Sequence, residues 1–249
     1  MGANGDELTD QATPAQAAGA SAHVSIVVPT YNEAGNVRPL LAALERALGG
    51  VAYEVVFADD SSDETPRFIE NAAAADPRVK LHHRSGRKGL ASAVVDALPL
   101  TSSDRVVVMD GDLQHPPELI PKLLKAQEEK GADVVVASRY TLGGGAGGLS
   151  GPLRVFASFS TRLAAYAILP RARLTADPLS GFFLFRRAAV EGAKLRPVGY
   201  KILLEILIRG RVGKVADVPL VFQKRAYEKS KAGPREAWNY LRQLWRLRA

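Results

Sequence analysis

The 249-residue sequence contains no cysteine and only two methionines and two tryptophans. Without cysteine, disulfide bonds, thiolate catalysis and cysteine-ligated zinc are all excluded. The absence agrees with a reducing compartment. Hydrophobic residues make up 47% of the chain and charged residues 24%, which is ordinary for a soluble globular protein. A chain of this length can bury the core of one large α/β domain.

Long hydrophobic runs are also missing. The longest, from Val155 to Leu169, contains Arg162 and is shorter than the roughly 20 residues that span a bilayer. The N-terminus is acidic and rich in alanine and glycine, without the compact apolar region of a secretory signal. We therefore expect a cytoplasmic protein that lies peripherally on the cytoplasmic face of a membrane. Whether a separate membrane-anchoring partner protein is needed stays open.

Three common catalytic motifs are absent. No Gly-x-Gly-x-x-Gly follows the first predicted strand, and no Gly-rich loop ending in Lys-Ser/Thr occurs. These absences disfavour a dinucleotide-binding oxidoreductase and a P-loop enzyme. The Gly-x-Ser-x-Gly turn that carries the nucleophile of many hydrolases is absent as well.

Positive charge is concentrated at the C-terminal end. The net charge is +7, and residues 224–249 hold eight basic and two acidic residues, a net charge of +6. Such a patch can bind nucleic acid, anionic lipid or a phosphate-bearing substrate, and charge alone does not choose among them. Because no recognised nucleic-acid-binding fold accompanies the patch, we expect no nucleic-acid partner.

Strands alternate with helices along the chain. Predicted strands cover residues 24–28, 53–58, 79–83, 105–109, 134–137, 182–185 and 215–222; predicted helices cover 34–48, 64–75, 88–98, 117–129, 153–169 and 201–209. This alternation predicts a mostly parallel sheet with helices on both faces. We expect a disordered leader over residues 1–22, an α/β domain over 23–232 and a basic amphipathic helix over 233–249.

The terminal helix is predicted to place four apolar side chains on one side, namely Trp238, Leu241, Leu244 and Trp245. Its other side carries Arg235, Asn239, Arg242 and Arg246. Tryptophans together with arginines favour a helix that lies in a membrane interface. The alternative is a helix docked on the domain with a solvated basic face. For residues 153–169, dipping into the membrane surface and packing on the sheet stay equally open.

Three polar clusters directly follow predicted strands, at residues 30–33, 59–63 and 110–115. In open parallel sheets, ligands bind beyond the carboxyl ends of the strands, so the clusters should converge on one rim. Asp110, Asp112 and Gln114 offer hard oxygen ligands that suit Mg²⁺ or Mn²⁺. An aspartate pair alone also fits a helix cap and a solvated turn; the neighbouring clusters favour the metal. His115 adjoins this run as a less favoured ligand.

These clusters carry a resemblance. Val28-Pro29-Thr30-Tyr31-Asn32-Glu33, Asp59-Asp60-Ser61 and Met109 to Pro117 resemble the family 2 inverting glycosyltransferases of the GT-A fold. Ser138-Arg139-Tyr140, Asp177 to Phe182 and the segment from Arg225 to Lys231 are similar to its polyprenol (dolichol) phosphate mannosyltransferase branch. Two positions depart from the pattern: Gly111 stands where alanine is usual, and Tyr227-Glu228 stands where the branch has a Gly-rich turn.

The resemblance implies a role for each matching position. The residues that would bind the nucleotide-sugar are Pro29, Tyr31, Glu33, Ala58, Asp60, Asp110, Gly111, Asp112 and Gln114, with Asp60 toward the base and ribose. Asp112 and Gln114 would hold the metal. Arg139, Arg225 and Lys231 would face the phosphates of the donor or acceptor and, with Asp112, form the catalytic set. Arg154 and Lys201 are further candidates for the acceptor phosphate.

The chemistry of the acceptor points the same way. A sugar hydroxyl would need a general base, whereas a phosphate monoester already carries about −1.5 to −2 charges and needs only cations to hold it. This agrees with what the resemblance implies, namely inverting, metal-dependent transfer of mannose from GDP-mannose to a polyprenyl (dolichyl-type) monophosphate. The alternatives are a UDP-hexose donor, a non-catalytic nucleotide-sugar or lipid-binding subunit, and a basic nucleic-acid-binding protein.

Overall fold

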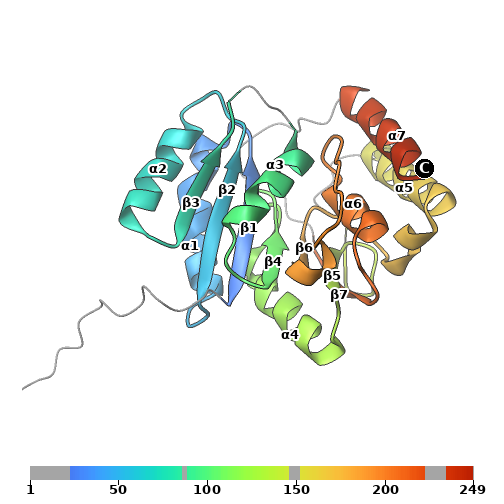
Figure 1. The fold of residues 1–249 in the computed structure, drawn as a ribbon, viewed down its shortest axis with the longest axis horizontal. Helices are drawn as coiled ribbons and strands as arrows, with labels where there is room; N and C mark the ends of the chain where they lie inside the picture. Colours follow the sequence, from blue (N-terminus) through green and yellow to red (C-terminus); the bar gives the residue numbers. More distant parts are fainter. Residues whose placement is uncertain (1–22, 86–88, 146–151, 222–233, 249) are drawn as a thin grey trace, which may run out of the picture.

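The structure is a computed structural model that describes residues 23–85, 89–145, 152–221 and 234–248 (Figure 1). The predicted leader, Arg225, Lys231 and part of the glycine-rich loop lie outside the described residues. The strands are β1 (Val24–Thr30), β2 (Tyr53–Asp59), β3 (Val79–His83), β4 (Arg105–Val108), β5 (Val134–Ser138), β6 (Phe183–Arg186) and β7 (Val215–Pro219). The α-helices are α1 (Val37–Ala47), α2 (Thr65–Ala75), α3 (Leu90–Ala97), α4 (Ile120–Lys130), α5 (Pro152–Ile168), α6 (Ile202–Arg209) and α7 (Pro234–Arg248).

The strands form one seven-stranded sheet in the order β3-β2-β1-β4-β6-β5-β7. β6 pairs antiparallel with β4 and β5, and the other pairs are parallel. The predicted, mostly parallel sheet is therefore confirmed. The carboxyl ends of β1, β2 and β4 meet at one rim. We call it the acidic rim because β2 ends there with Asp59 and Asp60, and Asp110 comes just after β4.

Alternate residues of the strands bury on opposite faces of the sheet. Val24, Ile26 and Val28 belong to the core beneath α1, α2 and α4, whereas Val27 belongs to the core beneath α3 and α6. This is the two-residue period of a strand covered on both sides. Figure 1 shows the resulting three layers, with helices in front of and behind the sheet.

The first strand runs further than expected. It continues through Pro29 to Thr30, although the sequence predicted that it would stop before the proline. Pairing with β4 ends at Val27, and the carbonyls of Val27 and Thr30 point toward β4 and β2 respectively. Pro29 therefore faces the side where no β4 residue is paired, and its missing N–H costs the ladder no hydrogen bond.

A third apolar cluster joins α5, α6 and α7 at one end of the molecule. Ala165, Leu169, Leu204, Tyr240 and Leu244 are all buried in it. The predicted terminal helix exists, but the prediction that Leu244 shares one face with the tryptophans is wrong. α7 docks through Tyr240, Leu244 and Leu247, and it leaves Trp238, Leu241 and Trp245 exposed. α7 therefore carries two apolar stripes, one of which packs against α5 and α6 while the other is exposed.

Candidate active site

The first two polar clusters are joined directly at the acidic rim. Thr30 donates from Oγ1 to Asp59 Oδ1 at 2.7 Å, and the backbone N–H of Asp60 donates to the carbonyl of Thr30 at 3.0 Å. The backbone N–H of Asn32 donates to Ser61 Oγ at 2.7 Å. The last residues of β1 and β2 and the loops that follow them thus form one hydrogen-bonded unit, as the parallel register predicts.

Asp59 is the buried centre of this unit. Its carboxylate is fully buried and accepts hydrogen bonds from Thr30 Oγ1, from Ser61 Oγ and from the backbone N–H of Ser61. Nδ1 of His83, at the end of β3, lies 2.8 Å from Asp59 Oδ2, the oxygen that also accepts the backbone N–H of Ser61. Such a carboxylate serves to hold the loops together, because its acceptor positions are occupied. In the loop after β1, Tyr31 is exposed and Glu33 is half-buried.

The third cluster packs against the first through a glycine. A Cβ atom at Gly111 would lie 3.2 Å from Thr30 Cγ2 and 3.4 Å from Val28 Cγ1. Thr30 therefore fills the space in which the alanine usual at this position would place its methyl group. The departure from the family pattern thus has a local steric reason, and the glycine brings the Asp110–Asp112 loop close to β1.

The backbone of both loops adopts an uncommon conformation. Asn32 has φ of 55° and Leu113 has φ of 62°, and these are the left-handed non-glycine residues within the described ranges. For an L-residue such as leucine this conformation costs about 1 kcal/mol or more. Leu113 is partly buried against the core beneath α1, which holds the loop in place. Strained residues of this kind concentrate at functional sites.

His115 packs beneath the loop of residues 110–114 and holds its backbone. It is buried, stacks on Phe182 with the ring centroids 5.2 Å apart, and accepts the backbone N–H of Asp110 at Nδ1 over 3.0 Å. Burial lowers the pKa of His115 to about 4; the charge of Asp112 opposes this, and the charges of Arg139 and Lys201 add to it. The imidazole is therefore neutral at pH 7. Because Nδ1 of the neutral ring accepts this bond, Nε2 carries the proton and has no lone pair for a metal, so His115 positions Asp110.

Asp112 and Gln114 are largely buried, and the side chain of Asp110 is 34% exposed. Asp112 Oδ1 accepts the backbone N–H of Gln114 at 3.1 Å. Within residues 23–85, 89–145, 152–221 and 234–248, no group of three or more His, Cys, Asp or Glu side chains could hold a metal ion. Two carboxylates and an amide oxygen fit an ion that takes its remaining ligands from substrate phosphates, as Mg²⁺ commonly does.

Arg139 reaches the same region from the end of β5. Its guanidinium donates from Nε and Nη2 to Asp177 at 2.7 and 2.8 Å, and the side chain of Asp177 is fully buried. Burial lowers the pKa of Arg139, but the hydrogen bonds and charge of Asp177 raise it more, with smaller contributions from Tyr140 and Asp110. Arg139 thus stays a cation beside Asp110, and Asp177 holds it there.

The other predicted cations are placed unequally. Lys201 donates from Nζ to the carbonyl of Leu179 at 3.0 Å and lies near enough to His115 to lower its pKa. It therefore belongs to the rim. Arg154 lies in the first turns of α5, where the side chains are not described. Arg225 and Lys231 lie outside the described residues, so their roles stay predictions.

One contact at the rim escaped sequence reasoning. The Arg84 guanidinium forms a buried pair with Asp60 and also contacts Asp96. The available signal was its position, because Arg84 follows the predicted strand 79–83 directly and must therefore lie at the same rim. The sequence places Asp177 in a motif but does not indicate its partner, which in the structure is Arg139.

Comparison with known proteins places these features in a family. The sequence model of the protein family described as glycosyl transferase family 2 matches residues 25–192 of this chain. The dolichol-phosphate mannosyltransferase of Pyrococcus furiosus is 42% identical over 90% of this chain, which spans 63% of that protein. The protein of the same name from Saccharomyces cerevisiae is 29% identical over 91% of this chain and 87% of its own length. The one from Mycosarcoma maydis is 31% identical over 90% of this chain and 78% of its own length.

A solved structure supports the fold. Glucosyl-3-phosphoglycerate synthase from Mycobacterium tuberculosis, in complex with Mn²⁺, UDP and glucosyl-3-phosphoglycerate, superposes with a TM-score of 0.63 and 22% identity. The match covers 91% of this chain and 78% of that one. It confirms the predicted GT-A class of α/β fold. The protein therefore belongs to glycosyltransferase family 2 and is similar to its dolichol-phosphate mannosyltransferases.

Proposed function

We propose that this protein transfers mannose from GDP-mannose to a polyprenyl (dolichyl-type) monophosphate with inversion at the anomeric carbon. The observation that carries the proposal is that the segment Asp177–Gly181 brings cations to the acidic rim. Asp177 holds Arg139, the carbonyl of Leu179 holds Lys201, and Gly181 lies against Asp110. The names of the three relatives support the acceptor class. The GDP-mannose donor rests on the resemblance of the motifs.

The chemistry requires little more than positioning. The acceptor oxygen is already anionic, so no side chain has to remove a proton from it. Two anionic substrates repel each other, and cations at the rim offset that repulsion. Arg139 is suited to a phosphate because the guanidinium presents paired N–H donors. Asp177 fixes the Arg139 side chain, so its orientation is set before the substrates arrive.

A divalent ion completes the proposed donor site. Asp112 and Gln114 would hold Mg²⁺ or Mn²⁺, with Asp110 beside them, and the ion would supply positive charge for the departing nucleoside diphosphate. The presence of Mn²⁺ and UDP with the mycobacterial synthase supports an ion of this kind. The protein itself contributes the loop: His115 and Gly111 hold the carboxylates at the edge of β1.

A transfer assay tests the proposal. Purified protein would be incubated with a polyprenyl phosphate and either GDP-mannose or UDP-glucose, with Mn²⁺ or with chelator. We expect mannosyl lipid only with GDP-mannose and Mn²⁺. Glucosyl lipid from UDP-glucose alone would replace the mannosyl donor with the UDP-hexose alternative. No transfer from any nucleotide-sugar, despite nucleotide binding, would favour a non-catalytic subunit.

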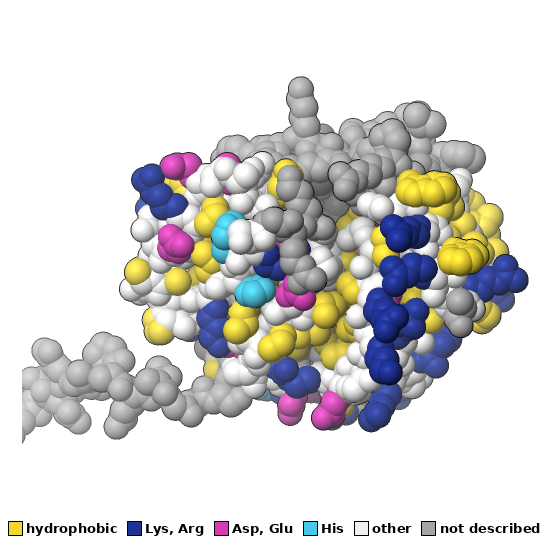
Figure 2. All heavy atoms as spheres, turned by 45° about the horizontal axis from the view of Figure 1, so that its top comes forward, with side chains coloured by type: hydrophobic (Ala, Val, Ile, Leu, Met, Phe, Trp, Pro, Cys, Tyr) yellow, Lys and Arg dark blue, Asp and Glu magenta, His cyan; other side chains and the backbone are white. Residues whose placement is uncertain are grey.

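We also propose that the protein lies on the cytoplasmic face of a membrane, where its acceptor would be found. In the described ranges no helix is long and apolar enough to cross a bilayer. Instead, Trp238, Leu241 and Trp245 of α7 and Phe159 and Leu163 of α5 are more than half exposed. Figure 2 shows hydrophobic side chains beside a column of basic ones on the right of the molecule, where α6 and α7 lie. Exposed tryptophans next to basic residues suit an anionic lipid surface.

A further inference from the structure

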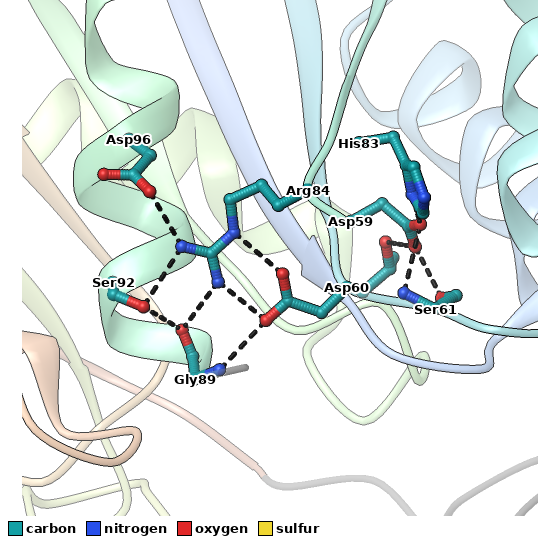
Figure 3. Close-up of polar contacts among 9 residues, drawn as sticks. Asp59, Asp60, Ser61, His83, Arg84, Gly89, Ser92 and Asp96 are labelled. Atoms are coloured by element: carbon teal, nitrogen blue, oxygen red, sulfur yellow. Dashed lines mark hydrogen bonds and ion pairs between the residues drawn. The ribbon is translucent and has the colours of Figure 1, made fainter. Parts of the chain in front are cut away.

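Arg84 occupies the junction between the acidic rim and α3. It follows β3 directly, and its side chain is only 4% exposed. Every one of its five N–H groups has a partner. Nε and Nη2 donate to the two oxygens of Asp60, Nη2 also donates to the carbonyl of Gly89, and Nη1 donates to Ser92 Oγ and Asp96 Oδ2 (Figure 3). No N–H of this guanidinium is left for a ligand.

Asp60 is held from three directions. Its Oδ1 accepts from Arg84 Nε at 2.7 Å, and its Oδ2 accepts from Arg84 Nη2 at 2.6 Å and from the backbone N–H of Gly89 at 2.9 Å. Its own backbone N–H donates to Thr30. A carboxylate has about four acceptor positions. The contacts within the described ranges fill three of them, which leaves one on Oδ1.

The pair also gives Asp60 a buried positively charged partner. Both side chains are at least 95% buried, with 4% of Arg84 and 5% of Asp60 exposed. Burial lowers the pKa of Arg84, but the hydrogen bonds to Asp60 and Asp96 raise it more, and the net pKa lies above its ordinary value. Arg84 is therefore a permanent cation. Its Nε and Nη2 donors lie 2.7 and 2.6 Å from the two oxygens of Asp60, so a buried positive charge stands directly beside that carboxyl group.

We infer that Arg84 is a positioning residue for nucleoside recognition. It does not contact the nucleotide; it acts through Asp60, which it holds in an orientation that lets Oδ1 accept one N–H or O–H of the nucleoside. The inference rests on the proposed function, because that proposal places the nucleoside at Asp60. It adds that the recognition depends on α3, since Ser92 and Asp96 anchor the other end of the guanidinium.

Arg187 provides a matched control. Its guanidinium also donates hydrogen bonds within the protein, to the backbone carbonyls of Leu98, Thr101 and Ser103. It follows β6, which is antiparallel to β4, so it lies at the end of the sheet opposite to the acidic rim. Arg187→Lys should therefore lower stability as Arg84→Lys does, without reaching the nucleoside.

The test is a double-mutant cycle on nucleotide affinity, measured by calorimetry with GDP and UDP in the presence of Mn²⁺. Coupled residues in one hydrogen-bond network interact strongly enough to change affinity by about tenfold. We expect Arg84→Lys to weaken binding of the preferred nucleotide by about tenfold relative to the wild type. Added to the Asp60→Asn variant, the same substitution should weaken binding by less than about twofold. In turnover, the KM for the donor should rise while the KM for the lipid and kcat stay near wild type.

Several results would overturn the inference. Unchanged nucleotide affinity in Arg84→Lys, an equal loss in Arg187→Lys, or an equal loss with and without Asp60 would each do so. If Arg84→Lys does not fold, the Ser92→Ala/Asp96→Asn variant releases the far end of the guanidinium; it should still weaken nucleotide binding, and unchanged binding would refute the idea. If the wild type binds neither nucleotide, the proposed function itself fails, which separates the two failures.

Discussion

The pair of Arg139 and Asp177 allows stability and activity to be separated. Asp177→Asn keeps the volume of the side chain and an oxygen for the backbone N–H of Arg139, but it removes the negative charge. The guanidinium, whose side chain is 12% exposed, would then lack its counter-charge. Breaking one partner of a buried ion pair costs about 3–5 kcal/mol. For a domain of this size each kcal/mol lowers Tm by about 2–4 °C, so we expect a drop of roughly 6–20 °C.

The double variant Arg139→Met/Asp177→Asn removes both charges. Replacing a buried pair by uncharged groups of similar size is commonly neutral, so Tm should return to within a few degrees of the wild type. Transfer should not return, because Arg139 is proposed to contact phosphate. Thermal unfolding gives the Tm of the wild type and the two variants, urea denaturation gives their free energy of unfolding, and a transfer assay on the same preparations gives the activity.

Two results would refute this reasoning. A loss below about 1 kcal/mol in Asp177→Asn would mean that solvent screens the pair, as it does for exposed ion pairs. Recovery of both stability and transfer in the double variant would mean that Arg139 is a structural residue. Either result would also remove Asp177 from the description of the site.

Three further outcomes are expected. Asp112→Ala should abolish Mn²⁺-dependent transfer with little change in Tm, and transfer at the wild-type rate would remove this residue from the metal site. Because burial holds the pKa of His115 at about 4 against 6.5 in the unfolded chain, only the unfolded chain takes up this proton between those values. Stability should therefore fall by up to about 3 kcal/mol as the pH drops from 7 to 4, and urea titrations of His115→Asn should lack that part of the slope. Trp238→Ser/Trp245→Ser should release the protein from anionic liposomes in a sedimentation assay, with Tm unchanged because both side chains are exposed; full retention would argue against the membrane surface.

The sheet and the acidic rim follow from local sequence signals. Apolar runs of strand length, each followed by a polar cluster, predict both the strands and their convergence, because parallel strands bring their carboxyl ends together. The expected strand 79–83 coincides with β3, and most other boundaries differ by one to three residues. The extension of β1 through Pro29 depends on which neighbouring strand is paired beside it, and no single strand contains that information.

The partners of the site residues depend on the tertiary fold instead. Arg84 and Asp60 are 24 residues apart, and Arg139 and Asp177 are 38 apart. Their pairing depends on loops that the periodicity of a strand or helix does not define. The same holds for α7, whose two apolar stripes are equivalent in sequence until the α5 and α6 surfaces select Tyr240, Leu244 and Leu247. The left-handed backbone of Leu113 has no signal in the residue type.

The reversed direction of β6 has a consequence for how the two substrates' sites can diverge. Because β6 starts at the rim, the segment Asp177–Gly181 before it enters the site from a later part of the chain, with Gly181 directly against Asp110 and His115. Under the proposed function, residues up to 115 would form the donor side, and residues from 139 onward would form the side that carries Arg139 and Lys201. The length and composition of the second part can vary while the register of β1, β2 and β4 is preserved. A new acceptor could therefore be accommodated while the nucleotide side is inherited unchanged.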